Sequence, residues 1–255
     1  MDKLRFVELF AGIGGFSLGF ERVGMECVGH VEIEPYAQKV LLKHWPDVPL
    51  MEDVKNVKGT EFGQIDLLCG GFPCQDLSVA GKRAGIDGDR SSLFKEIIRI
   101  ASICRPKYII FENVVQLVNR TDWFGAFLGE IAKIGYNAEW QTVQARDCGA
   151  IHERKRVFVV AYPMCERREG LEQSRGVSKI KQRGWCSQEN LREIFNSPFK
   201  QNDLWPQPLL RRVDDGVPHR LDRLKCIGNA LVPQIAEYIG QCILEREKAI
   251  TYLSD

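Results

Sequence analysis

The sequence lacks the features of secreted proteins, of proteins with a structural metal site and of membrane-spanning proteins. Its nine cysteines are an odd number and no two are spaced as Cys-x-x-Cys, so neither a disulfide framework nor a zinc or other metal site is expected. No run of about 18 apolar residues occurs, and the N-terminal apolar stretch is too short for a signal peptide. These absences predict a soluble protein without a membrane partner, in a reducing compartment such as the cytoplasm or the nucleoid.

Low-complexity tracts, internal repeats and a strong net charge are absent as well. The 255 residues include 35 Lys and Arg against 34 Asp and Glu, a net charge of +1 that neither indicates nor excludes a polyanionic partner. The 44% hydrophobic content is ordinary for a globular protein with a sizeable core. A chain of this length can form one α/β core and a small appendage.

Strand-like apolar segments alternate with segments of helical periodicity along most of the chain. Strands are expected at residues 4–10, 27–33, 65–69, 108–111, 140–145 and 156–162. Helices are expected after the glycines that follow the first strand and at residues 35–44, 93–104, 122–134 and 233–248. The alternation predicts an α/β fold with a parallel or mostly parallel sheet and helices on both faces.

The periodicity fades after residue 162, where a small, irregular second lobe is expected at residues 163–216. Residues 163–225 carry 13 Lys and Arg against nine Asp and Glu, so positive charge is concentrated in this part of the chain. Trp185 and Trp205 are expected to form the small core of the lobe rather than to stack on a ligand. The main domain would then comprise residues 1–162 and 217–255.

A glycine-rich turn and a distant carboxylate suggest a nucleoside cofactor. Residues 10–15, FAGIGG, follow the first strand, and Glu32 ends the second strand, 20 residues beyond Gly12. Glycines let the backbone approach a ligand, and a carboxylate so placed can accept hydrogen bonds from ribose hydroxyls. The Gly-x-Gly-Gly spacing differs from Gly-x-Gly-x-x-Gly, so a glycine-rich turn without a ligand is the alternative.

Three further motifs stand at strand ends. Cys74, in residues 70–75, GGFPCQ, could be a nucleophile or a packing residue. Glu112, in residues 111–114, FENV, could enter the same cleft or cap the following helix. Arg154 and Arg156 alternate onto one face, where they could bind an anion or form a solvated basic edge.

Together and in this order, these motifs resemble the cytosine-C5 DNA methyltransferase family. The matching segments are FAGIGG at 10–15, EIEPYA at 32–37, GGFPCQDLS at 70–78, FENV at 111–114, HERKR at 152–156 and IGNALVP at 227–233. The resemblance covers residues 1–162 and 217–248. It implies a Rossmann-like methyltransferase sheet and an enzyme that transfers a methyl group from S-adenosylmethionine, leaving S-adenosylhomocysteine, to C5 of cytosine in duplex DNA.

The resemblance also implies the catalytic roles. Cys74 stands where the family's cysteine adds to C6 of the cytosine, which makes C5 nucleophilic. Glu112 would bind N3 and the exocyclic amine, Arg156 would hold O2, and Arg154 would act beside it near the backbone.

The family's cofactor positions are matched from both parts of the main domain. Glu32 would bind the ribose, Ile33 would contact the adenine and Asp53 would bind the adenine amine. The full set is Phe10, Gly12, Gly14, Gly15, Glu32, Ile33, Asp53, Gly71, Pro73, Leu93 and Asn229.

The segment at residues 75–90 would close on DNA after the target base leaves the stack. Lys82, Arg83 and Arg90 of this segment are expected to contact phosphates. Gln75 and Ser78 are expected to insert near the space that the extruded base leaves in the duplex. The alternative is an ordinary exposed loop. In the second lobe, Lys181 and Arg183 are expected to bind phosphates.

The sequence departs from the family pattern at two points. His152 replaces the usual Gln, and the short lobe lacks the family's Thr-Leu pair, so a short or relaxed target site is expected. The alternatives are the tRNA branch of the family and a catalytically silent cofactor- or DNA-binding module. A monomer is expected, with no requirement for a cognate restriction endonuclease.

Overall fold

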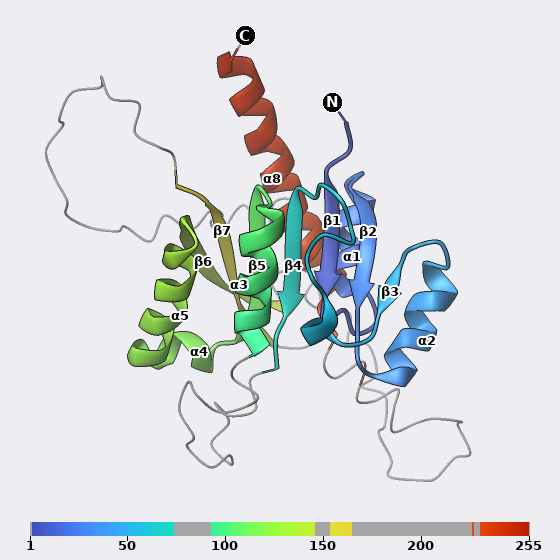
Figure 1. Ribbon diagram of the computed structural model, residues 1–255. Coiled ribbons are helices and arrows are strands. Elements are labelled where there is room, and N and C mark those ends of the chain that lie inside the picture. The colour runs from blue at the N-terminus through green and yellow to red at the C-terminus, as the bar shows by residue number, and fades with distance from the viewer. Residues whose placement is uncertain (1, 74–92, 146–153, 165–225, 227–229, 255) are drawn as a thin grey trace, which may run out of the picture.

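The computed structural model describes residues 2–73, 93–145, 154–164, 226 and 230–254 (Figure 1). Its centre is a seven-stranded sheet in the order β3-β2-β1-β4-β5-β7-β6. The strands are β1 (Arg5–Leu9), β2 (Glu26–Val31), β3 (Leu50–Met51), β4 (Leu67–Gly71), β5 (Tyr108–Val114), β6 (Tyr136–Gln144) and β7 (Lys155–Pro163). The helices are α1 (Gly15–Arg22), α2 (Pro35–His44), η1 (Val54–Asn56), α3 (Leu93–Cys104), α4 (Gln116–Asn119), α5 (Thr121–Lys133) and α8 (Pro233–Ser254).

The sheet is mostly parallel, as the sequence predicts. Strand β1 pairs in parallel with β2 and β4, β2 with β3, and β4 with β5, whereas β7 runs antiparallel between β5 and β6. The strand order reverses between β1 and β4, and open α/β sheets bind ligands beside such a switch point, at the carboxyl ends of their strands.

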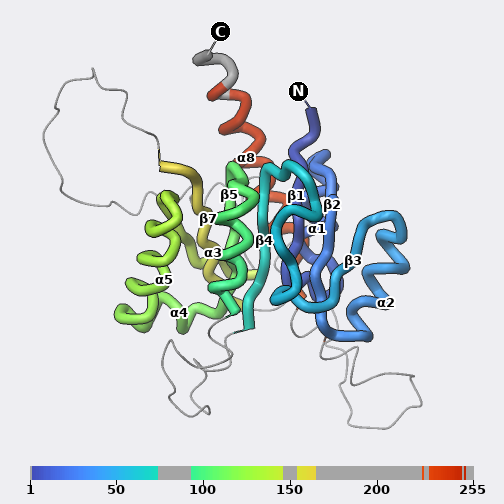
Figure 2. The backbone as a smooth tube through the Cα atoms, viewed as in Figure 1, coloured from blue at the N-terminus to red at the C-terminus, as the bar shows by residue number. Residues whose placement is uncertain are grey.

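Helices cover both faces of the sheet because the strands are apolar on both sides. Neighbouring residues of β1 show the division, since Phe6 packs in one core cluster and Val7 in the other. The Phe6 cluster includes side chains of α1 and α8, whereas the Val7 cluster includes side chains of α3 and α5. Figure 2 shows α3 and α5 on the near side of the sheet and α8 on the far side.

Several predicted elements coincide with the structure. Helices α2 and α3 have the predicted bounds, because each has an apolar periodic face and a clear end. Helix α8 packs in the core cluster that contains α1, and it continues to Ser254 instead of ending at the predicted residue 248.

Other elements depend on contacts that sequence periodicity does not show. Strand β3 has only two residues and exists through its pairing with β2. Gly70 and Gly71 belong to β4, although the predicted strand ends at residue 69. A Cβ atom on Gly70 would lie 2.7 Å from the Leu9 carbonyl oxygen, so close strand packing explains the glycine.

The predicted second lobe lies almost entirely outside the described residues. Only Pro163, which ends β7, and Met164 fall within both. In the part of the chain that the structure describes, no helix has the length and apolar character needed to cross a membrane.

Candidate active site

The glycine-rich loop between β1 and α1 has a conformation that restricts its residues. Gly12 and Gly14 have φ angles of 55° and 82°, in the left-handed region that favours glycine. A Cβ atom on Gly14 would also lie 2.5 Å from the Trp45 ring, and one on Gly15 would lie 2.8 Å from Leu231 Cβ. The loop is therefore packed between α2 and the start of the C-terminal segment.

The Glu32 carboxylate fastens this loop to the end of β2. Gly12 N donates to Glu32 Oε2 at 2.6 Å, and Glu34 N donates to Oε1 at 2.7 Å. Each carboxylate oxygen can accept a further hydrogen bond, which suits a ribose hydroxyl. The adjacent Ile33 side chain is 66% exposed and offers an apolar surface for a flat ring.

Glu112 lies at the end of β5, next to the antiparallel strand that carries Arg156. Arg156 Nε is 2.9 Å from Glu112 Oε1, yet this oxygen is buried and has no hydrogen-bond partner among the described residues. Burial raises the pKa of Glu112, while the charges of Arg156 and Arg154 oppose that increase. The carboxyl group therefore takes up a proton more readily than an exposed glutamate does, and it can still accept a hydrogen bond from a ligand.

Neighbouring residues on β4 and β5 hold Glu112 in place. A Cβ atom on Gly71 would lie 2.6 Å from Glu112 Oε2, so only glycine leaves room for this carboxylate position. The buried Asn113 side chain donates from Nδ2 to the Phe72 carbonyl oxygen at 3.0 Å. This bond ties the ends of β4 and β5 together just before Pro73, the residue that precedes Cys74.

One cavity of about 460 Å³ connects the glycine loop with the Glu112–Arg156 pair. Its volume is that of a typical small-molecule site. The predicted site residues among its lining are Phe10, Gly12, Gly15, Glu32, Ile33, Gly71, Pro73, Glu112, Arg154 and Arg156. The carboxyl ends of β1, β2, β4 and β5 and the start of antiparallel β7 thus bring ten predicted residues together.

Three predicted cofactor residues do not line this cavity. Gly14 packs against Trp45, and Leu93 packs beside the core cluster that contains α3. Asp53 caps η1, because its Oδ1 accepts a hydrogen bond from Lys55 N at 2.9 Å. Their roles toward a cofactor stay predictions.

The remaining predicted site residues lie outside the described part of the chain. They are Cys74, Gln75, Ser78, Lys82, Arg83, Arg90, Lys181, Arg183 and Asn229. Their roles also stay predictions. Within the described residues, no group of three or more His, Cys, Asp or Glu side chains could hold a metal ion.

Several lining residues were not identified from the sequence. Glu8 lies within an apolar strand, and its position inside the strand instead of at its end gave no signal for a ligand. The others are Ala11, Phe16, Glu34, Ala37, Asn113, Val114, Cys226, Ala230 and Leu231. Asn113 and Val114 belong to the FENV motif, and Ala230 and Leu231 to IGNALVP, so these motifs were the available signal.

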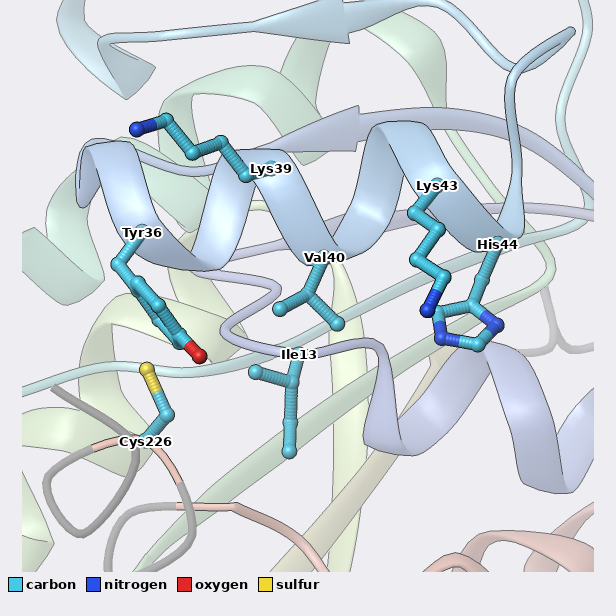
Figure 3. Close-up of a pocket in the computed structure, with 7 residues that line it drawn as sticks. All are labelled: Ile13, Tyr36, Lys39, Val40, Lys43, His44 and Cys226. Carbon is cyan, nitrogen blue, oxygen red and sulfur yellow. The ribbon is translucent and has the colours of Figure 1, made fainter. Parts of the chain in front are cut away.

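A second cavity of about 380 Å³ lies on the α2 side of the glycine loop (Figure 3). Its lining consists of Ile13, Tyr36, Lys39, Val40, Lys43, His44 and Cys226. Gly12 lines the first cavity and Ile13 the second, whereas Cys226 lines both. The glycine loop therefore lies between two cavities.

Comparison with known proteins agrees with this geometry. The family model for C-5 cytosine-specific DNA methylase matches residues 4–206. Type II methyltransferase M.HgiCII of Herpetosiphon aurantiacus is 37% identical over 182 residues, which are 69% of this chain and 39% of that protein. Type II methyltransferase M.HhaI of Haemophilus parahaemolyticus is 33% identical over 164 residues, 64% of this chain and 50% of that protein.

Solved structures show the same fold. A protein assigned as a DNA modification methyltransferase, encoded within an E. coli prophage, has a TM-score of 0.54 and 27% identity over 63% of this chain and 47% of that chain. Spodoptera frugiperda DNMT2, 22% identical with a TM-score of 0.53 over 63% of this chain and 50% of that chain, shares the fold.

The chain spans about 37 to 50% of the length of the curated relatives that it matches. The family model nevertheless covers most of its residues, including every motif from the glycine loop to Arg156. The chain therefore belongs to the C-5 cytosine-specific DNA methylase family.

Proposed function

We propose that this protein transfers a methyl group from S-adenosylmethionine to C5 of a cytosine in duplex DNA. The single observation that carries the proposal is one cavity with two parts. It joins the glycine loop, which is hydrogen-bonded to Glu32, to the buried Glu112–Arg156 pair. A cofactor and a base can meet in such a cavity, and its lining includes Pro73, which directly precedes Cys74 in the sequence.

The residues present fit S-adenosylmethionine. The loop backbone offers close approach, Glu32 has acceptor capacity for ribose hydroxyls, and Ile33 offers an apolar surface to the adenine. When bound, S-adenosylmethionine supplies the methyl group that C5 receives. The residues of the chain then have three roles: they bind the extruded base, they make C5 nucleophilic, and they transfer protons to and from the base.

Cys74 activates the base in this proposal. Its thiolate adds to C6 and the C5–C6 π electrons move toward C5 and N3, so C5 becomes nucleophilic. Glu112 donates or shares a proton at N3, and its Oε1, which lies beside Arg156 but has no well-aligned hydrogen bond among the described residues, accepts one from the exocyclic amine. Arg156 holds O2 and the Glu112 carboxyl group, and Arg154 adds positive charge beside them. After C5 has received the methyl group, water removes the C5 proton, the C5–C6 double bond re-forms as the Cys74–C6 bond breaks, and the N3 proton returns to Glu112.

We further propose that the protein acts as a monomer in a reducing compartment and needs no cognate endonuclease for methylation. One cavity contains both halves of the site within one chain. None of the described cysteines forms a disulfide bond, which suits a reducing compartment; they are Cys27, Cys69, Cys104, Cys226 and Cys242.

Incubation of the purified chain with S-adenosylmethionine and an unmethylated, sequence-diverse plasmid tests this function. We expect 5-methylcytosine in a defined sequence context by base-resolution sequencing. Cys74→Ser should bind cofactor and DNA but lose methylation, since a hydroxyl is a far weaker nucleophile near neutral pH. Methylation of total tRNA without methylation of DNA would contradict the proposal, and so would a fully active Cys74→Ser variant.

A further inference from the structure

A buried polar cluster lies beside the glycine loop and has no part in the mechanism above. It consists of Glu8 on β1, Ser17 on α1, and Cys27 and His30 on β2. Glu8, Ser17 and His30 are each at most 2% exposed, and Glu8 also lines the cofactor cavity. Because a buried carboxylate is costly without compensating hydrogen bonds, the partners of Glu8 indicate its role.

Glu8 caps helix α1 from the neighbouring strand. Phe16 N donates to Glu8 Oε1 at 3.1 Å, and Ser17 N donates to Oε2 at 2.9 Å. These amides belong to the first turn of α1, where they have no acceptor within the helix. The N-cap residue Gly14 has no side chain to serve them, so the carboxylate of Glu8 takes over that function.

This cap connects the two elements that flank the glycine loop, β1 and α1. The loop leaves β1 one residue after Leu9 and enters α1 at Gly15, while Glu8 joins the two elements from inside. Phe10 is held at a φ of 53°, in the left-handed region that is unfavourable for a residue with a Cβ atom. A loop held in this conformation needs restraint at both sides: Glu8 provides it from the core, and Glu32 from the cavity.

A hydrogen-bond chain continues from Glu8 to His30. Ser17 Oγ lies 2.5 Å from Glu8 Oε2 and 2.8 Å from His30 Nε2. Because ionised Glu8 can only accept, Ser17 donates its single hydroxyl proton to Glu8, and His30 donates from Nε2 to Ser17. A proton on Glu8 Oε2 reverses the chain and removes the charge that strengthens the bonds to the helix amides.

We propose that Glu8 is a positioning residue that holds the glycine loop in its cofactor-binding conformation only while it is ionised, so that proton uptake by Glu8 weakens cofactor binding. This inference rests on the proposed S-adenosylmethionine-dependent function. Fully buried Ser17 has no access to a substrate, so the Ser–His–Glu arrangement acts on the loop and not as a nucleophilic site.

The groups around Glu8 define the pH range of this effect. Burial raises the pKa of Glu8 to about 7, and the nearby charge of Glu32 adds to the increase. Burial lowers the pKa of His30 to about 4, raises that of Cys27 to about 12, and raises that of Cys69 well above its usual range. Between pH 6 and 8, His30, Cys27 and Cys69 therefore stay uncharged, whereas Glu8 changes from neutral to ionised as the pH rises.

Cofactor affinity of the full chain, measured by isothermal titration calorimetry with S-adenosylmethionine from pH 6 to 9, tests the inference. If binding requires ionised Glu8, affinity falls roughly tenfold from pH 8 to pH 6, as expected for a midpoint of about 7. The amino group of the ligand titrates in the same range, so each profile is compared with that of Glu8→Gln. Gln fits the space but cannot ionise, and we expect weak binding without the tenfold step. Glu26→Gln, an exposed position on β2, is the matched control and should follow the wild type.

Ser17→Ala gives a readout that a purely structural role would not change. Since the hydrogen bonds of Ser17 lower the pKa of Glu8, this variant should shift the midpoint of the affinity profile to higher pH. It also keeps the test decisive if Glu8→Gln does not fold. An unshifted midpoint, or a Glu8→Gln defect of equal size at every pH, overturns the inference but leaves the proposed function intact. Absence of binding by the wild type at every pH would instead overturn both.

Discussion

At the scale of single residues, the environment of Glu112 decides what its carboxyl group can do. Its neighbours include a guanidinium 2.9 Å away, but burial still raises its pKa. The buried Oε1 lies beside this guanidinium but has no well-aligned hydrogen bond among the described residues, so a donor on a bound base would supply one. A carboxyl group of this kind is suited to a ring nitrogen and an adjacent amine.

Gly71→Ala should displace this carboxyl group without touching the nucleophile. The new Cβ atom would lie 2.6 Å from Glu112 Oε2, so the side chain must move away from its position beside Arg156. We expect the single-turnover methylation rate to fall roughly 100-fold, because misplacement by about 1 Å has effects of this size. Gly125→Ala is the control, since nothing lies within 4 Å of that position. An unchanged rate in Gly71→Ala would mean that the position of Glu112 does not limit the reaction.

At the scale of elements, the crossing of α1 and α8 connects the core to the cavity wall. A Cβ atom on Gly19 of α1 would lie 2.4 Å from the Pro233 carbonyl oxygen and 2.5 Å from Ala236 Cβ. The helices therefore approach closely at a glycine. Leu231, which lines the cavity, directly precedes this crossing and packs on Gly15.

Gly19→Ala should destabilise the fold by separating these two helices. Overpacking of this kind costs about 1–3 kcal/mol, which would appear as a lower midpoint of urea unfolding. Gly129→Ala is the matched control in α5, where the added Cβ atom meets nothing within 4 Å. It should stabilise the protein by up to about 1 kcal/mol, because alanine is the better helix former. Equal midpoints for the two variants would contradict the tight crossing.

The elements also show how far sequence periodicity reaches. Helices α2 and α3 were predicted with correct bounds, since an amphipathic face and helix-ending signals lie within the segments themselves. The two-residue strand β3, the extension of β4 through its glycines and the early start of β6 at Tyr136 were missed. These features depend on pairing with strands that are distant in sequence.

At the scale of the whole molecule, the two ends of the parallel strands carry different groups of residues. At the carboxyl ends lie the glycine loop, Glu32 and Glu112, together with Arg154 and Arg156. The ion pairs of Lys107 with Asp66 and Glu247 lie instead beside the start of β5. In the proposed function, DNA reaches the cavity at the carboxyl ends of these strands.

Replacement of Lys181 and Arg183 by alanine should flatten the salt dependence of DNA binding. Each lost phosphate contact lowers the slope of log K against log salt by about 0.9, so we expect a decrease of about 1.8. Lys3→Ala with Lys248→Ala is the control: it removes the same charge from exposed positions before β1 and on α8, away from the cavity lining. Equal slopes for the two double variants would place Lys181 and Arg183 away from phosphates.

The sequence by itself determined the family, the α/β class and the residue types of the site, because motifs such as FAGIGG and FENV are local and carry their chemistry in the side chains. Only the tertiary structure showed that Gly71 makes room for Glu112, that Asp53 caps η1, and that Glu8 caps α1 while lining the cavity. The physical reason is that burial, close approach and shifted pKa values arise between residues from different elements. Glu112 and Arg156 meet across two antiparallel strands, and no local pattern in either segment specifies that distance.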